Sequence, residues 1–85
     1  MKKLVEVENE SLEALLGETI TILGVCYFYT GKLVGVNDMC VKLENPSIIY
    51  QTGAWDKGSW EDAQKLPGDI YVMLSQIESY GPWGK

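Results

Sequence analysis

The chain has 85 residues, of which 46% are apolar and 22% are charged, and its formal net charge is −5. This length accommodates a single domain over residues 1–85, and so small a domain buries little surface unless it assembles into an oligomer. The sequence contains no histidine, and all 7 of its basic residues are lysine. Catalytic sites that need histidine, histidine-ligated zinc and arginine clamps for phosphate are therefore excluded. We expect a non-catalytic protein, not an enzyme, without a cofactor or a metal ion.

The charge balance and the cysteines indicate the compartment and the partners. Binding to nucleic acid depends on neutralising several phosphates, and here 7 lysines are scattered among 12 acidic residues. No signal-like segment is visible, and no apolar run reaches the roughly 20 residues that a membrane span needs. Cys26 and Cys40 form neither a Cys-x-x-Cys pair nor a dense disulfide framework. We therefore expect a cytoplasmic protein that contacts neither nucleic acid nor a membrane.

Residues 9–16 are expected to form a short N-terminal helix. Leu12, Leu15 and Leu16 recur at i, i+3 and i+4, which places them in one apolar stripe. Gly17 then suits the left-handed conformation that commonly ends a helix. Two helical turns are not stable alone, so the stripe must pack against the rest of the domain.

Beyond this helix the pattern changes to the period of two that is typical of β-strands. Residues 19–22 alternate hydroxyl and branched apolar side chains. Gly31 and Gly35 indicate that the next strand is strongly bent. Asn37-Asp38 and Asn45-Pro46 are typical turn pairs. Five strands are expected, over residues 19–22, 27–36, 39–44, 47–52 and 69–74.

Residues 54–68 interrupt the strand pattern and form an insertion between the fourth and the fifth strand. Within it, Ser59-Trp60-Glu61-Asp62 resembles a capping box, in which side chains satisfy the free N–H groups at a helix start. This predicts a short helix over residues 59–65, which ends before Pro67-Gly68. Residues 75–85 are rich in aromatic residues and glycine and are expected to be a tail, able to pack as an arm on its own or on an adjacent subunit.

One segment resembles the first motif of the Sm-like family. It runs Gly31-Lys32-Leu33-Val34-Gly35-Val36-Asn37-Asp38-Met39-Cys40-Val41-Lys42-Leu43-Glu44-Asn45, with the glycine, the Asn-Asp turn and the alternating strand of that motif in Hfq-type spacing. The resemblance covers residues 9–53. It implies a mostly β fold, a small five-stranded antiparallel barrel formed by residues 18–53 and 69–74, with the short helix before it. It also implies homo-oligomeric rings, in which the fourth strand of one subunit pairs with the fifth strand of the next.

Two residues of this chain stand at positions that are functional in the Sm-like family. Asn37 and Asp38 stand where the family's pore-lining loop stands, and they are ligand-binding candidates on that ground. The second half of the chain departs from the family, because the link to the fifth strand is long and contains tryptophan, and the Tyr-Lys-His signature of the Hfq type is absent. The family's binding of uridine-containing RNA is therefore kept as an alternative function.

The insertion carries the most informative candidate site. Trp55 and Trp60 offer flat faces on which a nucleobase can stack. Lys57, the N–H groups near Gly58 and a helix start at Ser59 would hold a phosphate. Together these residues predict a small nucleotide-like ligand. In the alternative interpretation, the two tryptophans cover an open end of the barrel or an interface between subunits.

The sequence thus favours an oligomeric, non-catalytic protein that captures a small nucleotide-like ligand. The chain also resembles the small accessory proteins of tailed phages in overall style, and a phage protein of this kind would sequester a host immune signal in the host cytoplasm. The first alternative is a structural or protein-interaction subunit of a phage or another assembly, in which Tyr27-Phe28-Tyr29 places tyrosine against a neighbouring subunit. The second alternative is Sm-like RNA binding, against which the charge balance weighs.

Overall fold

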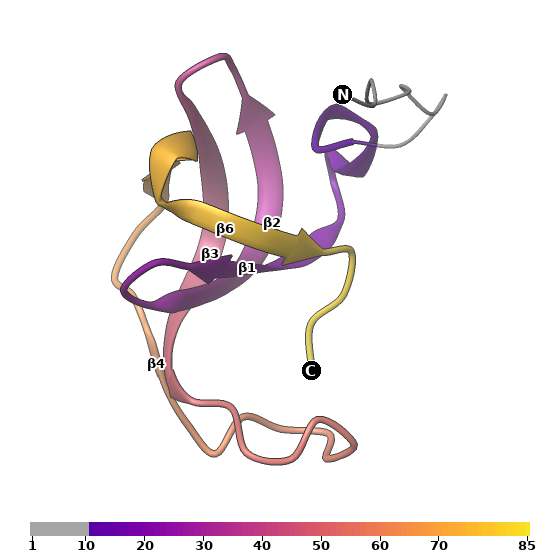
Figure 1. The fold of residues 1–85 in the computed structure, drawn as a ribbon, viewed down its shortest axis with the longest axis vertical. Coiled ribbons are helices and arrows are strands. Elements are labelled where there is room, and N and C mark those ends of the chain that lie inside the picture. Colours follow the sequence, from indigo (N-terminus) through magenta and orange to yellow (C-terminus); the bar gives the residue numbers. More distant parts are fainter. Residues whose placement is uncertain (1–10) are drawn as a thin grey trace, which may run out of the picture.

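The computed structural model describes residues 11–85, and this part of the chain is mostly β with little helix (Figure 1). Its six strands are β1 (Thr19–Gly24), β2 (Phe28–Val36), β3 (Cys40–Gln51), β4 (Asp62–Lys65), β5 (Ile70–Met73) and β6 (Ile77–Gly81). Two 3-10 helices, η1 (Glu13–Leu15) and η2 (Leu74–Gln76), precede β1 and β6. The strands pair antiparallel in the order β4-β3-β2-β1-β6, and β5 pairs with the same edge of β3 as β4 does.

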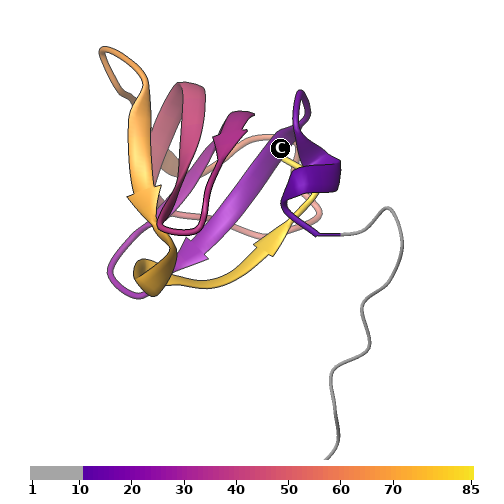
Figure 2. The same cartoon turned by 90° about the horizontal axis from the view of Figure 1, so that it is seen from above.

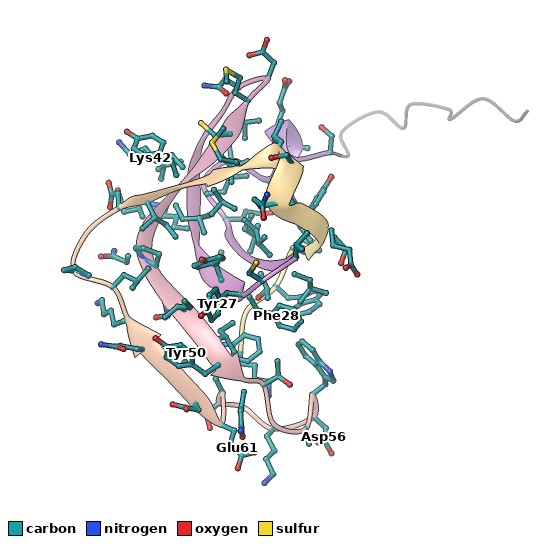
Figure 3. All side chains as sticks on the ribbon, turned by 60° about the vertical axis from the view of Figure 1, so that its left-hand side comes forward. Tyr27, Phe28, Lys42, Tyr50, Asp56 and Glu61 are labelled. Carbon is teal, nitrogen blue, oxygen red and sulfur yellow. The ribbon has the colours of Figure 1, made fainter. Side chains whose placement is uncertain are left out.

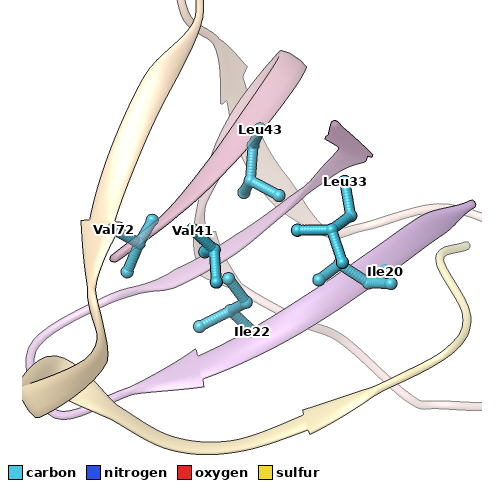
Figure 4. Close-up of a cluster of buried hydrophobic side chains, with 6 residues drawn as sticks. All are labelled: Ile20, Ile22, Leu33, Val41, Leu43 and Val72. Carbon is cyan, nitrogen blue, oxygen red and sulfur yellow. The ribbon is translucent and has the colours of Figure 1, made fainter. Parts of the chain in front are cut away.

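The core lies inside the curl of the sheet and follows from the alternating sequence. Ile20 and Ile22 alternate with threonine in β1, and both side chains are fully buried. The buried cluster consists of six side chains, Ile20, Ile22, Leu33, Val41, Leu43 and Val72 (Figure 4). Burying a side chain of this size stabilises a fold by about 1.5–3 kcal/mol. The three-stranded β1–β2–β3 meander is therefore the framework that carries the loops.

Strand β3 bends at Asn45 instead of turning there. Asn45 adopts a left-handed conformation with φ of 50°, and the Pro46 side chain is fully buried. Opposite the bend, the ladder with β2 is irregular, and a Cβ at Gly31 would lie 3.2 Å from the Glu44 carbonyl oxygen. The expected division into strands over 39–44 and 47–52 is therefore wrong. Asn45 forms a bulge within one continuous strand where a turn was expected, and pairing with β2 continues on both sides of it.

The sheet curls around the core without closing (Figure 2). β5 lies on the outer edge of β3 and β6 on the outer edge of β1, but no ladder connects β5 to β6 within residues 11–85. Single backbone bonds hold this side: Val25 N–H donates to the Gln76 carbonyl and Leu74 N–H to the Met39 carbonyl, both at 2.9 Å. The expected five-stranded barrel is thus corrected to a six-stranded sheet that stays open.

The helix expected over residues 9–16 is also corrected. Its first two residues lie outside the described part of the chain, and the rest contains only the 3-10 turn η1. Leu12 and Leu15 pack against the core, as the predicted stripe requires. Gly17, at φ of 90°, donates its N–H to the Leu33 carbonyl at 2.7 Å, which directs the chain into β1 before a second turn forms. Among residues 11–85, no helix has both the length and the apolar character that a membrane crossing requires.

Two strands form where none was expected. Residues 62–65 pair with β3 as β4, so the helix predicted over 59–65 is absent. The outer edge of β3 presents a row of backbone donors and acceptors, and pairing with it outweighs the local capping pattern. Residues 77–81 pair with β1 as β6 for the same reason, so the tail expected over residues 75–85 is limited to the segment after Gly81.

Candidate functional site

The predicted site residues fall at opposite ends of the long axis (Figure 1). Asn37 and Asp38 form the turn between β2 and β3. Trp55 and Trp60 lie in the Trp loop, which we define as residues 52–61 between β3 and β4. One chain therefore does not bring the two groups together into one site.

At the β2–β3 turn, the Asn37 side chain supports the backbone. Its Oδ1 atom accepts hydrogen bonds from the N–H groups of Met39 and Cys40, both at 2.8 Å. This arrangement explains why the Asn-Asp pair turns the chain here. Asp38 beside it is exposed. Their assignment as ligand-binding residues stays a prediction.

The Trp loop brings together the three tryptophans of the chain. The Trp55 ring meets Trp60 edge-to-face at 5.8 Å between centroids and meets Trp83 at 5.4 Å. Trp83 follows β6, and its carbonyl accepts a hydrogen bond of 2.6 Å from the buried Thr21 hydroxyl. Gly81 leaves room for the Trp83 ring, which a Cβ at position 81 would overlap. The segment after β6 therefore covers one side of the Trp loop.

Lys85 enters the Trp loop from this segment. Its ammonium donates hydrogen bonds to the carbonyls of Thr52 at 2.5 Å, Ala54 at 2.8 Å and Ser59 at 3.3 Å. It also lies 4.8 Å from the centroid of the Trp60 ring and 5.6 Å from that of Trp55. Both separations are within the range in which an aromatic face attracts a cation. No local feature of the sequence indicates this contact, because Lys85 is 26 residues or more from each carbonyl that it reaches.

The polar groups at this point are acceptors, whereas a phosphate site needs donors. No helix of the described chain begins at Ser59, so the helix dipole that was expected to attract a phosphate is absent. The backbone N–H of Lys57 is used within the loop, where it donates to the Ala54 carbonyl at 3.1 Å. With its carbonyl groups and tryptophan faces directed at one point, the loop attracts a cation. Phosphate binding at Lys57 and Ser59 stays a prediction without its expected helix.

A second candidate site, not predicted from the sequence, lies where the sheet stays open. It is a groove of about 390 Å³ between β5 and the β1–β2 turn. Three tyrosines line it, Tyr27, Tyr29 and Tyr71, together with apolar side chains that include Val25 and Met73. Val25 and Tyr71 are each 65% exposed. The sequence of β5 contains part of the evidence for this site, because Tyr71 and Met73 alternate with the inward Ile70 and Val72 and therefore lie on the outer face. That face becomes one wall of a groove only because the β1–β2 turn lies opposite it, and the sequence does not show this proximity.

The groove continues into a neighbouring hollow. A smaller hollow beside it shares Cys26 and Tyr27 with the groove and extends to Tyr50 on β3. Figure 3 shows Tyr27, Phe28 and Tyr50 gathered at this place, and the Tyr27 and Tyr50 rings meet edge-to-face at 6.2 Å. We call Val25, Tyr27, Tyr50, Tyr71 and Met73 the aromatic face; each of them is exposed.

One cation lies beside the groove. The Lys42 ammonium is 5.6 Å from the centroid of the Tyr71 ring and 3.8 Å from a carboxylate oxygen of Asp69. The Lys42 side chain is 38% exposed, so water weakens this ion pair. An anionic ligand on Tyr71 can therefore reach a positive charge.

The described residues contain no cluster of three or more histidine, cysteine, aspartate or glutamate side chains placed to hold a metal ion. Cys26 and Cys40 are free thiols, the first exposed and the second half-buried. Comparison of the sequence with models of protein families and with curated proteins yields no match.

Proposed function

We propose that this protein is a non-catalytic binding protein that holds a planar, nucleotide-like ligand in the groove between β5 and the β1–β2 turn. The observation that carries this proposal is the concave, tyrosine-lined space of about 390 Å³ at the open side of the sheet. Small-molecule sites are typically concave, mostly apolar and about 300–1,000 Å³ in volume. Such a protein acts by sequestering its ligand.

The lining of the groove suits a nucleobase better than a flexible aliphatic ligand. Tyr27, Tyr29 and Tyr71 supply aromatic faces, and stacking on such a face is worth about 1–3 kcal/mol per base. Lys42 beside Tyr71 supplies a charge for a phosphate group. The net charge of −5 disfavours ligands with many phosphates, so we propose a ligand with one or two.

Homo-oligomerisation belongs to this proposal, and two features support it. Among the strands of residues 11–85, β4, β5 and β6 each pair on one edge only, which leaves their outer edges available to another chain. The aromatic face extends beyond the groove to Tyr50, which is 49% exposed. Tyrosine is enriched at interfaces between proteins.

The same aromatic face favours one second candidate function, a protein-interaction subunit of a larger assembly. Its exposed side chains then pack against another protein, and the groove takes a partner's side chain in place of a free ligand. The two functions make opposite predictions for binding of a nucleotide by the isolated protein.

Calorimetric titration with mononucleotides and with cyclic di- and trinucleotides tests the proposal. We expect heat on addition of at least one of them, and we expect Tyr71→Ala to weaken this binding by about tenfold, because one stacked face is lost. Tyr80→Ala is the matched control, since Tyr80 is an exposed tyrosine of β6 outside the groove. No heat with any nucleotide, or equal weakening by both substitutions, would contradict the proposal and favour the interaction subunit.

A further inference from the structure

We propose that the Trp loop is a receptor for a primary alkylammonium ion, and that Lys85 occupies it as an exchangeable internal ligand. Three carbonyl groups of the loop converge on one point, those of Thr52, Ala54 and Ser59. The Trp55 and Trp60 rings lie against the same point, at 5.6 and 4.8 Å from the bound nitrogen. The site is independent of the groove proposed above.

The geometry selects a primary ammonium over other cations. A primary ammonium has three N–H donors, which matches the three acceptors at 2.5, 2.8 and 3.3 Å. A trimethylated ammonium retains the attraction to the tryptophan faces but has no N–H, so it leaves the three carbonyls unsatisfied. A guanidinium is planar and directs its donors outward in a fork, which does not suit acceptors that converge on one atom.

The Trp loop holds this shape through contacts of its own. The Lys57 N–H donates to the Ala54 carbonyl at 3.1 Å, and the Trp55 and Trp60 rings contact each other edge-to-face. Gly53 takes a left-handed conformation at φ of 69°, and a Cβ at this position would lie 3.2 Å from the Glu61 Cβ. None of these contacts involves residue 85, so the receptor persists when Lys85 leaves.

The charge of the surroundings has the sign that a cation needs. Asp56 and Glu61 belong to the Trp loop (Figure 3). Asp62 follows at the start of β4, and all three side chains are exposed. Among the side chains of the loop, Lys57 is the single cation. The local balance is therefore negative, and the net charge of −5 adds to it.

Lys85 competes with any external amine because it belongs to the same chain. A tethered group acts at an effective concentration on the order of millimolar. An external amine must exceed that concentration in wild-type protein but binds directly once the internal ligand is removed. The external ammonium can belong to a free diamine or to a lysine side chain of another protein chain, and both offer the same chemistry to the receptor.

Intrinsic tryptophan fluorescence reads this site directly, because all three tryptophans of the chain belong to its cluster. We expect Lys85→Met to respond to 1,5-diaminopentane at about a tenfold lower concentration than wild-type protein does, since the tethered competitor is gone. Nα-acetyl-lysine methylamide represents the lysine side chain. A response to it would show that the receptor can bind a lysine of another protein chain as well as a free diamine. Its Nε-trimethyl form should bind at least about tenfold more weakly.

Lys57→Met is the matched control, because it removes a lysine of the same loop whose ammonium is not the one in the receptor. It should respond like wild-type protein. Trp60→Ala added to Lys85→Met should abolish the response. Chemical shifts of the indole N–H groups in wild-type protein at saturating diamine provide a second measurement that needs no variant. The proposal is overturned if these signals stay unchanged and Lys85→Met gains no response, or if the trimethyl form binds as well as the primary amine.

Discussion

The two aromatic clusters of this domain differ in what their faces already contact. In the Trp loop, Trp55 is packed edge-to-face between Trp60 and Trp83, and Lys85 lies against its ring. On the aromatic face, Tyr71 is 65% exposed and lines an open groove. The comparison teaches that aromatic residues in a loop do not by themselves mark a site for a planar ligand. What matters is whether chain segments distant in the sequence already contact the rings, as Trp83 and Lys85 contact the Trp55 ring, although Trp55 is still 52% exposed.

Removing the framework that both clusters share should have the largest effect. Leu33 is a fully buried member of the core cluster, and Leu33→Ala should lower the free energy of unfolding by about 2–5 kcal/mol. Chemical denaturation followed by circular dichroism and by tryptophan fluorescence measures this. Val34→Ala, at a neighbouring position that is 37% exposed, should change it by less than about 0.5 kcal/mol. Equal effects at the two positions would contradict the assignment of the core.

Trp55→Ala should affect the Trp loop and leave the groove unchanged, and it therefore distinguishes the roles of the two clusters. Its ring makes two edge-to-face contacts, each worth about 0.5–1.5 kcal/mol, so we expect a loss of about 1–3 kcal/mol in the free energy of unfolding. Nucleotide binding in the groove should be unchanged, whereas Tyr71→Ala should weaken binding with little loss of stability. If Trp55→Ala instead weakens nucleotide binding and leaves the stability intact, the ligand lies in the Trp loop, as the sequence predicts.

Thr21→Val should have the smallest effect and act on one cluster only. The buried Thr21 hydroxyl donates to the Trp83 carbonyl, and losing a hydrogen bond of this kind costs about 0.5–1.5 kcal/mol. Looser packing of Trp83 should shift the tryptophan emission to longer wavelength, without any change in groove binding. Thr19→Val, at an exposed position of the same strand, controls for the substitution. An emission spectrum unchanged by Thr21→Val would show that this bond does not position Trp83.

The parts of the fold that could be predicted are those with a local cause. The alternation at residues 19–22 produces β1, the Asn37 side chain produces the β2–β3 turn, and Gly31 marks the irregularity in the ladder between β2 and β3. In each case the physical reason lies within a few residues, so a single sequence is sufficient to recognise it.

The unpredicted parts depend on partners that are distant in the sequence. β4 has no strand-like composition over residues 62–65 and exists because the outer edge of β3 accepts it. β6 exists because of the free edge of β1. The sequence singles out the insertion over residues 54–68, but it does not predict the cation there, because nothing near Trp55 indicates that Lys85 returns to it.

Nuclear magnetic resonance spectroscopy during a nucleotide titration tests the central claim most directly, because it reports both clusters in one sample. The account predicts that backbone signals of Val25, Tyr27 and Tyr71 shift as the ligand fills the groove, while the indole N–H signals of the three tryptophans stay in place. Shifts confined to the indole signals would contradict it, as would no shift at any nucleotide concentration.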